Sequence, residues 1–243
     1  MQATGEPAGF DAIVLAGGRA ARLGGADKPA LRVGGSSLLG AVVSAAAAAG
    51  AGRCIIVGPP RPGVTPAGQP GPGQPGPGQP GPGQPGAEQP GEPGGESWPR
   101  AFPSGRLLVV QEQPPQSGPV PAIRRGLAEV QAPWIAVLAG DLPFLTGDQL
   151  RALLQAAPGA GCVLADDGGR PQWLAGVWRT SELRQACGQY RGSSVRGLLG
   201  PLAPALLRPQ LPPGEPPPWL DCDSPADLAA ARAWAGPGRE GPS

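Results

Sequence analysis

A segment rich in glycine and basic residues near the N-terminus has the residue types that could hold a polyphosphate. It reads LAGGRAARLGGADK, from Leu15 to Lys28. Gly17 and Gly18 would let the backbone approach a phosphate closely, and Arg22 and Lys28 would supply positive charge. The spacing matches neither GxxxxGK[ST] nor GxGxxG, so a P-loop and a dinucleotide-binding turn are both excluded. An ordinary strand-to-helix turn is the alternative interpretation of the glycines alone.

A second candidate is an aspartate that follows an apolar stretch in the middle of the chain. The run WIAVLA, from Trp134 to Ala139, is typical of a buried strand and leads directly to Gly140 and Asp141. A carboxylate at the carboxyl end of a central strand can hold Mg²⁺ through one oxygen and leave positions for water and phosphate oxygens. We therefore expect Asp141 to be a metal ligand, with a turn or helix-cap aspartate as the alternative.

Together these motifs resemble those of a known family. The pattern LAGGxxxRxGGxDK is similar to the signature of the molybdenum cofactor guanylyltransferases and their nucleotidyltransferase relatives, and GDLPF after the central strand resembles their aspartate segment. Sugar-nucleotide pyrophosphorylases are similar at the glycines but usually have proline before the lysine, where this chain has Asp27. The resemblance implies that Arg22, Lys28 and Asp141 are the catalytic residues.

The resemblance also implies a nucleotide-binding set. The segment QSGPVPAI, from Gln116 to Ile123, matches the family's glycine turn that opens a helix, and the dipole of such a helix suits an anion. Gln113 stands where some members have an acid that contacts the nucleoside. The implied nucleotide-binding residues are Leu15, Ala16, Gly17, Gly18, Lys28, Gln113, Gly118 and Asp141.

A segment near the C-terminus resembles the one that closes the family's active site. In DCDSPADL, from Asp221 to Leu228, the second position of the pair is Asp223, so Asp141 and Asp223 are the implied Mg²⁺ ligands. Helix capping is the alternative here, because Ser224 and Asp227 have the spacing of a capping box.

The acceptor side is implied by two further segments. QWLAGVWR, from Gln172 to Arg179, resembles the family strand that lines the acceptor, and a small helix at 194–196 would lie beside it. These segments imply Trp173 and Arg196 as acceptor-binding residues, although an ordinary surface arginine also explains Arg196.

The implied reaction requires no side-chain base. An acceptor phosphate, anionic at neutral pH, would attack the α-phosphorus of GTP and expel pyrophosphate, and positioning and charge stabilisation would suffice for catalysis. That fits a chain without histidine. By resemblance, the acceptor would be the molybdopterin cofactor, in a cytoplasmic enzyme with a cofactor-accepting protein as a further partner.

Two alternatives to guanylyl transfer stay open. One is cytidylyl or other nucleotidyl transfer to a different phosphorylated acceptor, and the other is a non-catalytic nucleotide-binding domain that regulates a partner. Gly17 bears on the base, because GTP-using members typically read LAGG whereas the cytidylyl branch typically has alanine at the third position. Gly17 therefore favours GTP.

Alternating apolar patterns in the rest of the chain predict its fold. Strands are expected at 12–16, 53–58, 106–112, 134–139, 161–165 and 172–178, and helices at 37–49, 120–130, 146–157 and 224–234. Near-continuous apolar strands that alternate with helices favour a single-domain, three-layer α/β/α fold with a mostly parallel, Rossmann-like sheet. The ligand of such a sheet lies beyond the carboxyl ends of its strands, where the motifs stand.

A stretch rich in glycine and proline interrupts this pattern. GQPGP pentads repeat between Gly68 and Gly86, and without apolar side chains residues 59–104 are predicted to be a disordered insertion. The domain would then comprise residues 1–58 and 105–236, with 237–243 as a disordered tail. A polyproline-type docking segment for a partner is the alternative.

Composition excludes several other classes of protein. The 19 basic and 18 acidic residues create no field that would hold nucleic acid or an anionic membrane, and the longest apolar run is too short to span a bilayer. The first residues have no signal-peptide pattern. The four cysteines are widely spaced in a chain without histidine, which indicates buried thiols rather than zinc ligands.

Overall fold

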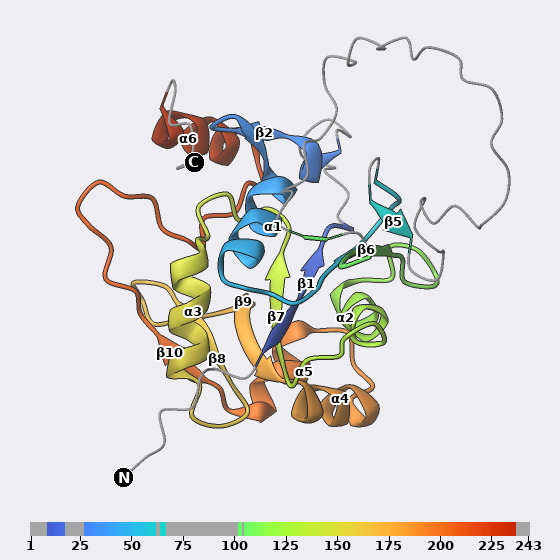
Figure 1. Ribbon diagram of the computed structural model, residues 1–243. Coiled ribbons are helices and arrows are strands. Elements are labelled where there is room, and N and C mark those ends of the chain that lie inside the picture. The colour runs from blue at the N-terminus through green and yellow to red at the C-terminus, as the bar shows by residue number, and fades with distance from the viewer. Residues whose placement is uncertain (1–8, 18–26, 62–63, 67–101, 104, 237–243) are drawn as a thin grey trace, which may run out of the picture.

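The computed structural model describes residues 9–17, 27–61, 64–66, 102–103 and 105–236. Within these residues one mixed sheet of eight strands forms the centre of the molecule, in the order β10-β8-β9-β7-β1-β4-β6-β5 (Figure 1). Its strands are β1 (Phe10–Leu15), β4 (Cys54–Val57), β5 (Thr65–Pro66), β6 (Leu107–Val110), β7 (Trp134–Ala139), β8 (Gly161–Ala165), β9 (Pro171–Arg179) and β10 (Ala205–Leu207).

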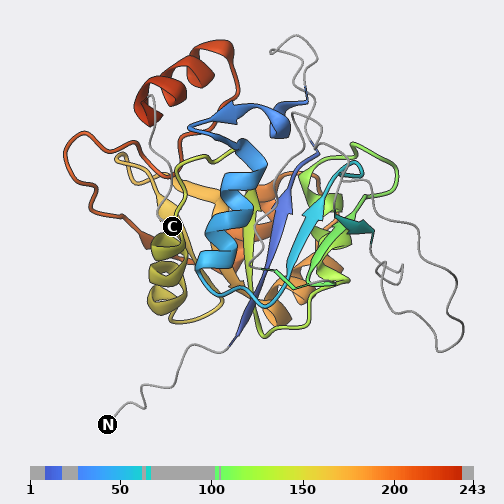
Figure 2. The same cartoon turned by 45° about the horizontal axis from the view of Figure 1, so that its top comes forward.

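Helices cover both faces of this sheet (Figure 2). The α-helices are α1 (Leu38–Ala48), α2 (Pro119–Leu127), α3 (Gly147–Ala156), α4 (Thr180–Gln189), α5 (Val195–Leu199) and α6 (Pro225–Ala235). The short elements are the 3₁₀ turns η2 (Lys28–Ala30) and η3 (Gly200–Leu202) and the small antiparallel pair β2 (Arg32–Val33) and β3 (Ser36–Ser37).

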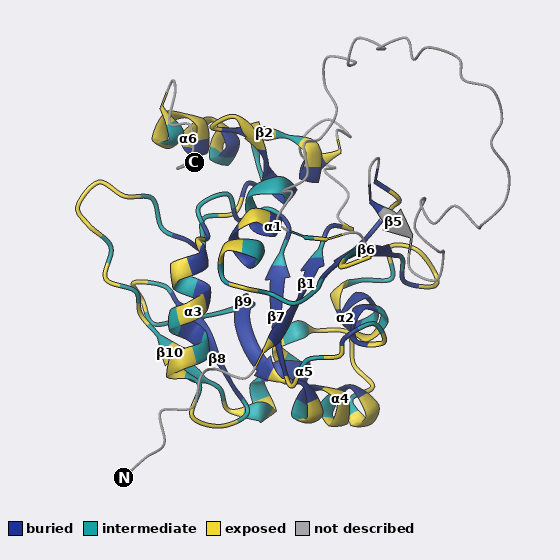
Figure 3. Ribbon diagram, viewed as in Figure 1, coloured by how far each residue is buried: buried dark blue, intermediate teal, exposed yellow. Residues whose placement is uncertain are grey.

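The alternation of side chains along the strands assigns each helix to a face. Val14 and its same-face neighbours pack with α1 and α3, whereas Ile13 and its same-face neighbours pack with α2, α4 and α5. Successive residues of a strand point to opposite faces, so a central strand that is apolar throughout must be covered on both. The three-layer α/β/α fold predicted from the sequence is confirmed, and Figure 3 shows the buried strands between the more exposed helices.

The sheet is parallel except around one strand. β1 pairs in parallel with β4 and β7, and β6 continues the parallel part beyond β4. β9 runs antiparallel to both β7 and β8, because it returns from β8 through a short turn at Asp166–Arg170. The carboxyl ends of β1, β4, β6 and β7 therefore lie at one edge of the sheet.

Two glycines allow close backbone approach at that edge. An added Cβ at Gly58 would lie 2.9 Å from the carbonyl carbon of Ala16, and one at Gly140 would lie 2.8 Å from the carbonyl oxygen of Leu15. The Gly140 N–H donates to that same oxygen at 2.9 Å. Residues that follow β4 and β7 can thus pack directly against the end of β1.

The range that the sequence analysis set aside as an insertion contributes residues to the domain. Thr65–Pro66 forms β5 and pairs with Leu108 and Val109 of β6, and Arg61 and Val64 are buried. Phe102 packs against the main core. Described residues at both ends of 59–104 thus belong to the folded domain, and the GQPGP pentads lie outside the described residues.

The cysteines behave as the sequence predicts. All four are buried and free, and burial raises the pKa of the Cys54 thiol to about 12, so this thiol stays protonated at neutral pH. None of the helices in the described part of the chain is long and apolar enough to cross a membrane.

Candidate active site

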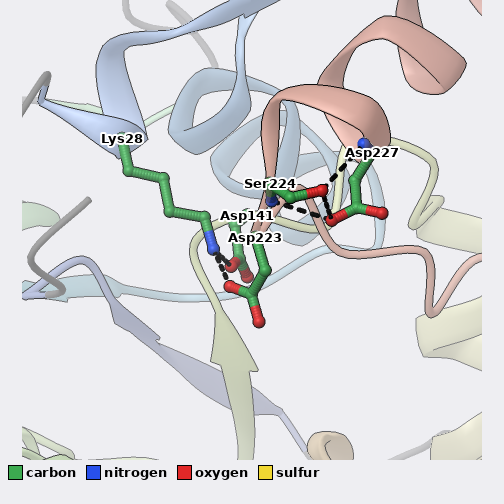
Figure 4. A network of polar contacts seen from close by, with 5 residues as sticks. All are labelled: Lys28, Asp141, Asp223, Ser224 and Asp227. Carbon is green, nitrogen blue, oxygen red and sulfur yellow. Dashed lines mark hydrogen bonds and ion pairs between the residues drawn. The ribbon is translucent and has the colours of Figure 1, made fainter. Parts of the chain in front are cut away.

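Three side chains from distant parts of the chain meet at the carboxyl edge of the sheet. The Lys28 ammonium group donates hydrogen bonds to Asp141 Oδ2 and to Asp223 Oδ1, and it forms an ion pair with each (Figure 4). Lys28 is buried, Asp141 is mostly buried, and the Asp223 side chain is 56% exposed. The predicted catalytic residues Lys28 and Asp141 and the predicted ligand Asp223 therefore form one cluster that is open on the Asp223 side.

Local structure explains why these side chains converge. Lys28 begins η2, and Asp141 follows Gly140 directly after β7. Asp223 precedes α6, whose first turn has a complete capping box: Ser224 Oγ accepts from the Asp227 N–H, and Asp227 Oδ2 accepts from the Ser224 N–H at 2.8 Å. The predicted helix cap is confirmed, and it leaves the carboxylate of Asp223 free to face Lys28.

The electrostatics of the cluster favour a charged lysine. Burial lowers the pKa of Lys28, but its hydrogen bonds and ion pairs to Asp141 and Asp223 outweigh that effect and hold the pKa above the ordinary value of 10.5. Lys28 is also the only lysine of the chain, because the remaining basic residues are all arginines. Its ammonium group is a fixed positive charge at the edge of the sheet.

A third carboxylate in the cluster was missed by the sequence analysis. Burial, together with the nearby charges of Asp223 and Asp141, raises the pKa of Asp221 above its ordinary value of 3.8. Asp221 lies in the segment DCD, but the family resemblance implied only Asp223 as a ligand. The negative charge around Lys28 therefore exceeds what one ammonium group neutralises.

The donor set suits a magnesium ion that keeps water ligands. Asp141 and Asp223 converge on one cationic group, and in the described part of the chain no three Cys, Asp or Glu side chains are grouped as a metal site. Mg²⁺ binds through one or two carboxylates plus water and substrate phosphates rather than through a full protein cage. Asp141 and Asp223 are the residues that would hold it, and the bound ion would neutralise charge on the phosphates.

The predicted nucleotide-binding turn is described only at its two ends. Leu15 ends β1, the Ala16 N–H donates to the Val57 carbonyl at 2.8 Å, and Gly17 is exposed beyond the sheet. An added Cβ at Gly17 would lie 3.8 Å from Glu112 Oε1, which is an ordinary contact. The predicted residues Gly18 and Arg22 lie outside the described part of the chain.

The segment between β6 and α2 approaches Gly17 through Glu112. Gly118, the N-cap of α2, has φ 104°, which favours glycine, and Gln113 is exposed. Glu112, which the sequence analysis did not select, is buried, and its Oε1 accepts from the Gln116 N–H at 2.7 Å. The other oxygen, Oε2, is buried and has no hydrogen-bond partner among residues 9–17, 27–61, 64–66, 102–103 and 105–236. An unpaired buried carboxylate oxygen is uncommon and marks this segment as a candidate ligand contact.

A cavity of about 410 Å³ adjoins the aspartates. Its lining includes Asp141, Asp223 and Trp173, together with Trp219, which the sequence analysis did not select. Trp173 is therefore placed beside the aspartates. Arg196 is exposed on α5 and does not line this cavity, although its neighbour Val195 does.

Another residue missed by the sequence analysis supports the segment that carries the lysine. The Arg61 guanidinium group binds the Asp27 carboxylate through two nitrogens, with Nη2 to Oδ1 at 3.0 Å. The Arg61 side chain is 4% exposed. Arg61 lies in a proline-rich stretch after β4, and that composition gave no sign that the residue supports the site.

The fold is shared with several solved nucleotidyltransferases. A nucleotidyl transferase from Methanothermobacter has 19% identity and a TM-score of 0.61, over 93% of this chain and 97% of that one. The 2-C-methyl-D-erythritol 4-phosphate cytidylyltransferase of Thermus thermophilus has 19% identity and a TM-score of 0.56, over 93% and 98%. Molybdopterin-guanine dinucleotide biosynthesis protein A of Archaeoglobus fulgidus has 15% identity and a TM-score of 0.53, over 92% and 97%.

These likenesses, at less than 25% identity, establish the fold. No curated protein sequence matches the chain significantly. A family model, described as the MobA-like NTP transferase domain, matches residues 12–205, which include most of β1, Lys28 and Asp141. The chain therefore belongs to the MobA-like NTP transferase family and is a nucleotidyltransferase.

Proposed function

We propose that this enzyme transfers GMP from GTP to the phosphate of molybdopterin, with Mg²⁺ as cofactor and pyrophosphate as the second product. The observation that carries the proposal is the position of the Lys28, Asp141 and Asp223 cluster at the mouth of a cavity with aromatic walls. The cluster suits phosphoryl chemistry, and the cavity suits a flat acceptor.

The walls of the cavity support the choice of acceptor. Trp173 and Trp219 both line it, together with Gln172, and the two aspartates lie in the same lining. A fused heterocycle such as a pterin would gain stacking and burial against indole rings, and its polar edges would find hydrogen-bond partners. A small phosphorylated polyol would cover little of this apolar surface.

The proposed preference for guanine as the nucleobase depends on Gly17. An added Cβ at Gly17 would make ordinary contacts with Gly58, Val57 and Glu112 at 3.7–3.8 Å. A purine needs more room than a pyrimidine, so the absence of a Cβ at this position favours GTP over CTP. Glu112 lies beside Gly17, and its Oε2 has no hydrogen-bond partner in the described part of the chain.

The chain's own residues account for the chemistry by positioning and charge. Lys28, with Arg22 assigned by family resemblance, would stabilise the β- and γ-phosphates as they leave. Asp141 and Asp223 would hold Mg²⁺, which supplies positive charge to the phosphate oxygens. The acceptor phosphate is already a nucleophile at neutral pH, and preorganised charges of this kind are the main source of catalysis in phosphoryl transfer.

A substrate matrix tests the proposal. GTP and CTP are each incubated with molybdopterin or with 2-C-methyl-D-erythritol 4-phosphate in the presence of Mg²⁺, and pyrophosphate is measured. GTP with molybdopterin should give the highest kcat/KM. Preference for CTP with the erythritol phosphate would make this a cytidylyltransferase of the same fold, and nucleotide binding without turnover on any pair would favour a regulatory domain.

A further inference from the structure

Lys28 and its neighbour Asp27 are held from opposite sides of β1. Lys28 bonds to Asp141, which follows β7, whereas Asp27 bonds to Arg61, which follows β4. β7 and β4 are the two strands that flank β1 in the sheet. The Asp27–Lys28 pair therefore bridges the end of β1, with one anchor on each flanking strand.

Arg61 makes a specific contact with Asp27. Its guanidinium group holds both oxygens of the Asp27 carboxylate, and such two-point pairing fixes orientation as well as distance. The Arg61 side chain is 4% exposed although Asp27 is 52% exposed, and Arg61 Nε is buried with no hydrogen-bond partner among the described residues. Burial of a charged guanidinium group is costly unless it is paired, which argues against an incidental surface pair.

The Asp27 side chain binds Arg61 and does not cap η2. It is the N-cap of η2, where an aspartate usually accepts a hydrogen bond from the following backbone, yet its side chain makes no such bond. The carboxylate faces Arg61 instead. This ion pair thus ties the residue that precedes η2 directly to the segment after β4.

We propose that Arg61 is a positioning residue that fixes Lys28 in the active site by holding Asp27. This inference rests on the proposed function in one respect: the carboxylates that hold Lys28 here are also the expected Mg²⁺ ligands. When a metal ion engages Asp141 and Asp223, Lys28 needs a second support to stay aimed at the phosphates, and the Arg61–Asp27 pair supplies it. It also gives a reason for aspartate rather than proline before the lysine.

The single lysine of the chain provides a direct test that requires no substrate. In protein labelled with ¹³C-lysine, Lys28 gives the only lysine Cε–Hε signal, apart from any lysine added by a tag. With Mg²⁺ present to engage Asp141 and Asp223, Arg61→Met should move this signal toward that of an unfolded chain while the tryptophan signals keep their dispersion. Arg125→Met is the matched control, because Arg125 of α2 forms an ion pair with Glu129 just beyond the end of that helix, and it should leave the signal in place. An unchanged Lys28 signal in Arg61→Met would overturn the proposal.

Steady-state kinetics test the same proposal, with the nucleotide and acceptor that give the wild type its highest kcat/KM. Arg61→Met should lower kcat about 10- to 100-fold, the usual effect of a small misplacement, with a smaller change in KM. The Asp27 side chain is half exposed, so Asp27→Asn should fold even if Arg61→Met does not. Like Arg61→Met, it should shift the Lys28 signal and lower kcat. The double variant should be no slower than the slower single variant, because both act through one contact. Multiplicative losses would mean that Arg61 acts independently of Asp27 and would overturn the proposal.

Discussion

Lys28 and Asp141 are ion-paired although 113 residues separate them in the sequence. The parallel sheet makes this possible, because β1 and β7 are neighbours and end at the same edge. Asp141 contributes more than Asp223 to the raised pKa of Lys28, and Asp223 completes the cluster from the start of α6. Any change to one member alters the electrostatics of the others.

The first prediction concerns the metal ligand. Asp141→Asn should abolish Mg²⁺-dependent turnover while the protein stays folded, because the amide has lost the charge that holds the ion. It should also lower the pKa of Lys28, since burial would be opposed by fewer hydrogen bonds and charges. Asp148→Asn on α3, where the carboxylate is exposed, is the matched control and should retain wild-type turnover. Unchanged activity in Asp141→Asn would remove this residue from the site.

The raised pKa of Lys28 predicts how stability depends on pH. Its folded-state pKa lies above the ordinary value of 10.5, so the charged group favours the folded state below that value, and this contribution is lost as the pH rises through the folded pKa. The difference in free energy of unfolding between wild type and Lys28→Met should therefore be constant from pH 8 to about pH 10 and shrink above it. Denaturant titrations at several pH values measure it. A wild-type stability that instead rises relative to Lys28→Met between pH 8 and pH 10 would mean that burial, which lowers the pKa, dominates.

Asp221 should destabilise the metal-free protein at neutral pH. A carboxyl group with a raised pKa ionises more easily in the unfolded chain, so it favours unfolding at pH 7, and the cost disappears on protonation at low pH. Asp221→Asn should raise Tm at pH 7 in the presence of EDTA, and the gain should vanish as the pH falls. Asp167→Asn, on the exposed turn between β8 and β9, should change Tm little. A lower Tm in Asp221→Asn would show that its charge supports the fold.

The framework of the fold could be predicted because its signals are local. The run at Trp134–Ala139 coincides with β7, and the capping patterns at Thr146 and Ser224 mark the starts of α3 and α6. α4 was missed because only three of its residues, Thr180, Leu183 and Cys187, are buried, which is too few for a clear amphipathic pattern. β10 was missed for a related reason, since its three residues form an edge strand with partly exposed side chains.

The candidate site could be predicted only where a motif surrounds the residue. Lys28, Asp141 and Asp223 stand in recognisable segments, but their mutual contacts depend on strand order, which local patterns do not specify. Arg61 stands among prolines that composition assigned to an insertion, and its importance follows only from its contact with Asp27. Trp219 lies in another proline-rich stretch and becomes a site residue only through the cavity.

The prediction for the nucleotide base depends on Gly17. A Cβ at this position would make only ordinary contacts of 3.7–3.8 Å, so Gly17→Ala should fold normally. It should reduce kcat/KM for GTP relative to CTP by roughly 10- to 200-fold, the usual range for a steric change of this size in a binding pocket. Gly188→Ala on α4, where an added Cβ meets nothing within 4 Å, is the control and should leave the ratio unchanged. An unchanged ratio in Gly17→Ala would show that this position does not select the base.

The central claim is transfer of the nucleoside monophosphate itself, and isotope placement measures it most directly. The enzyme is incubated with molybdopterin and Mg²⁺ and with GTP labelled at either the α- or the γ-phosphate. We predict that the α label becomes attached to molybdopterin and that an equal amount of γ label leaves as pyrophosphate, with neither event in Asp141→Asn. Release of γ label as inorganic phosphate, or α label that never reaches the acceptor while α-labelled CTP does, would contradict guanylyl transfer.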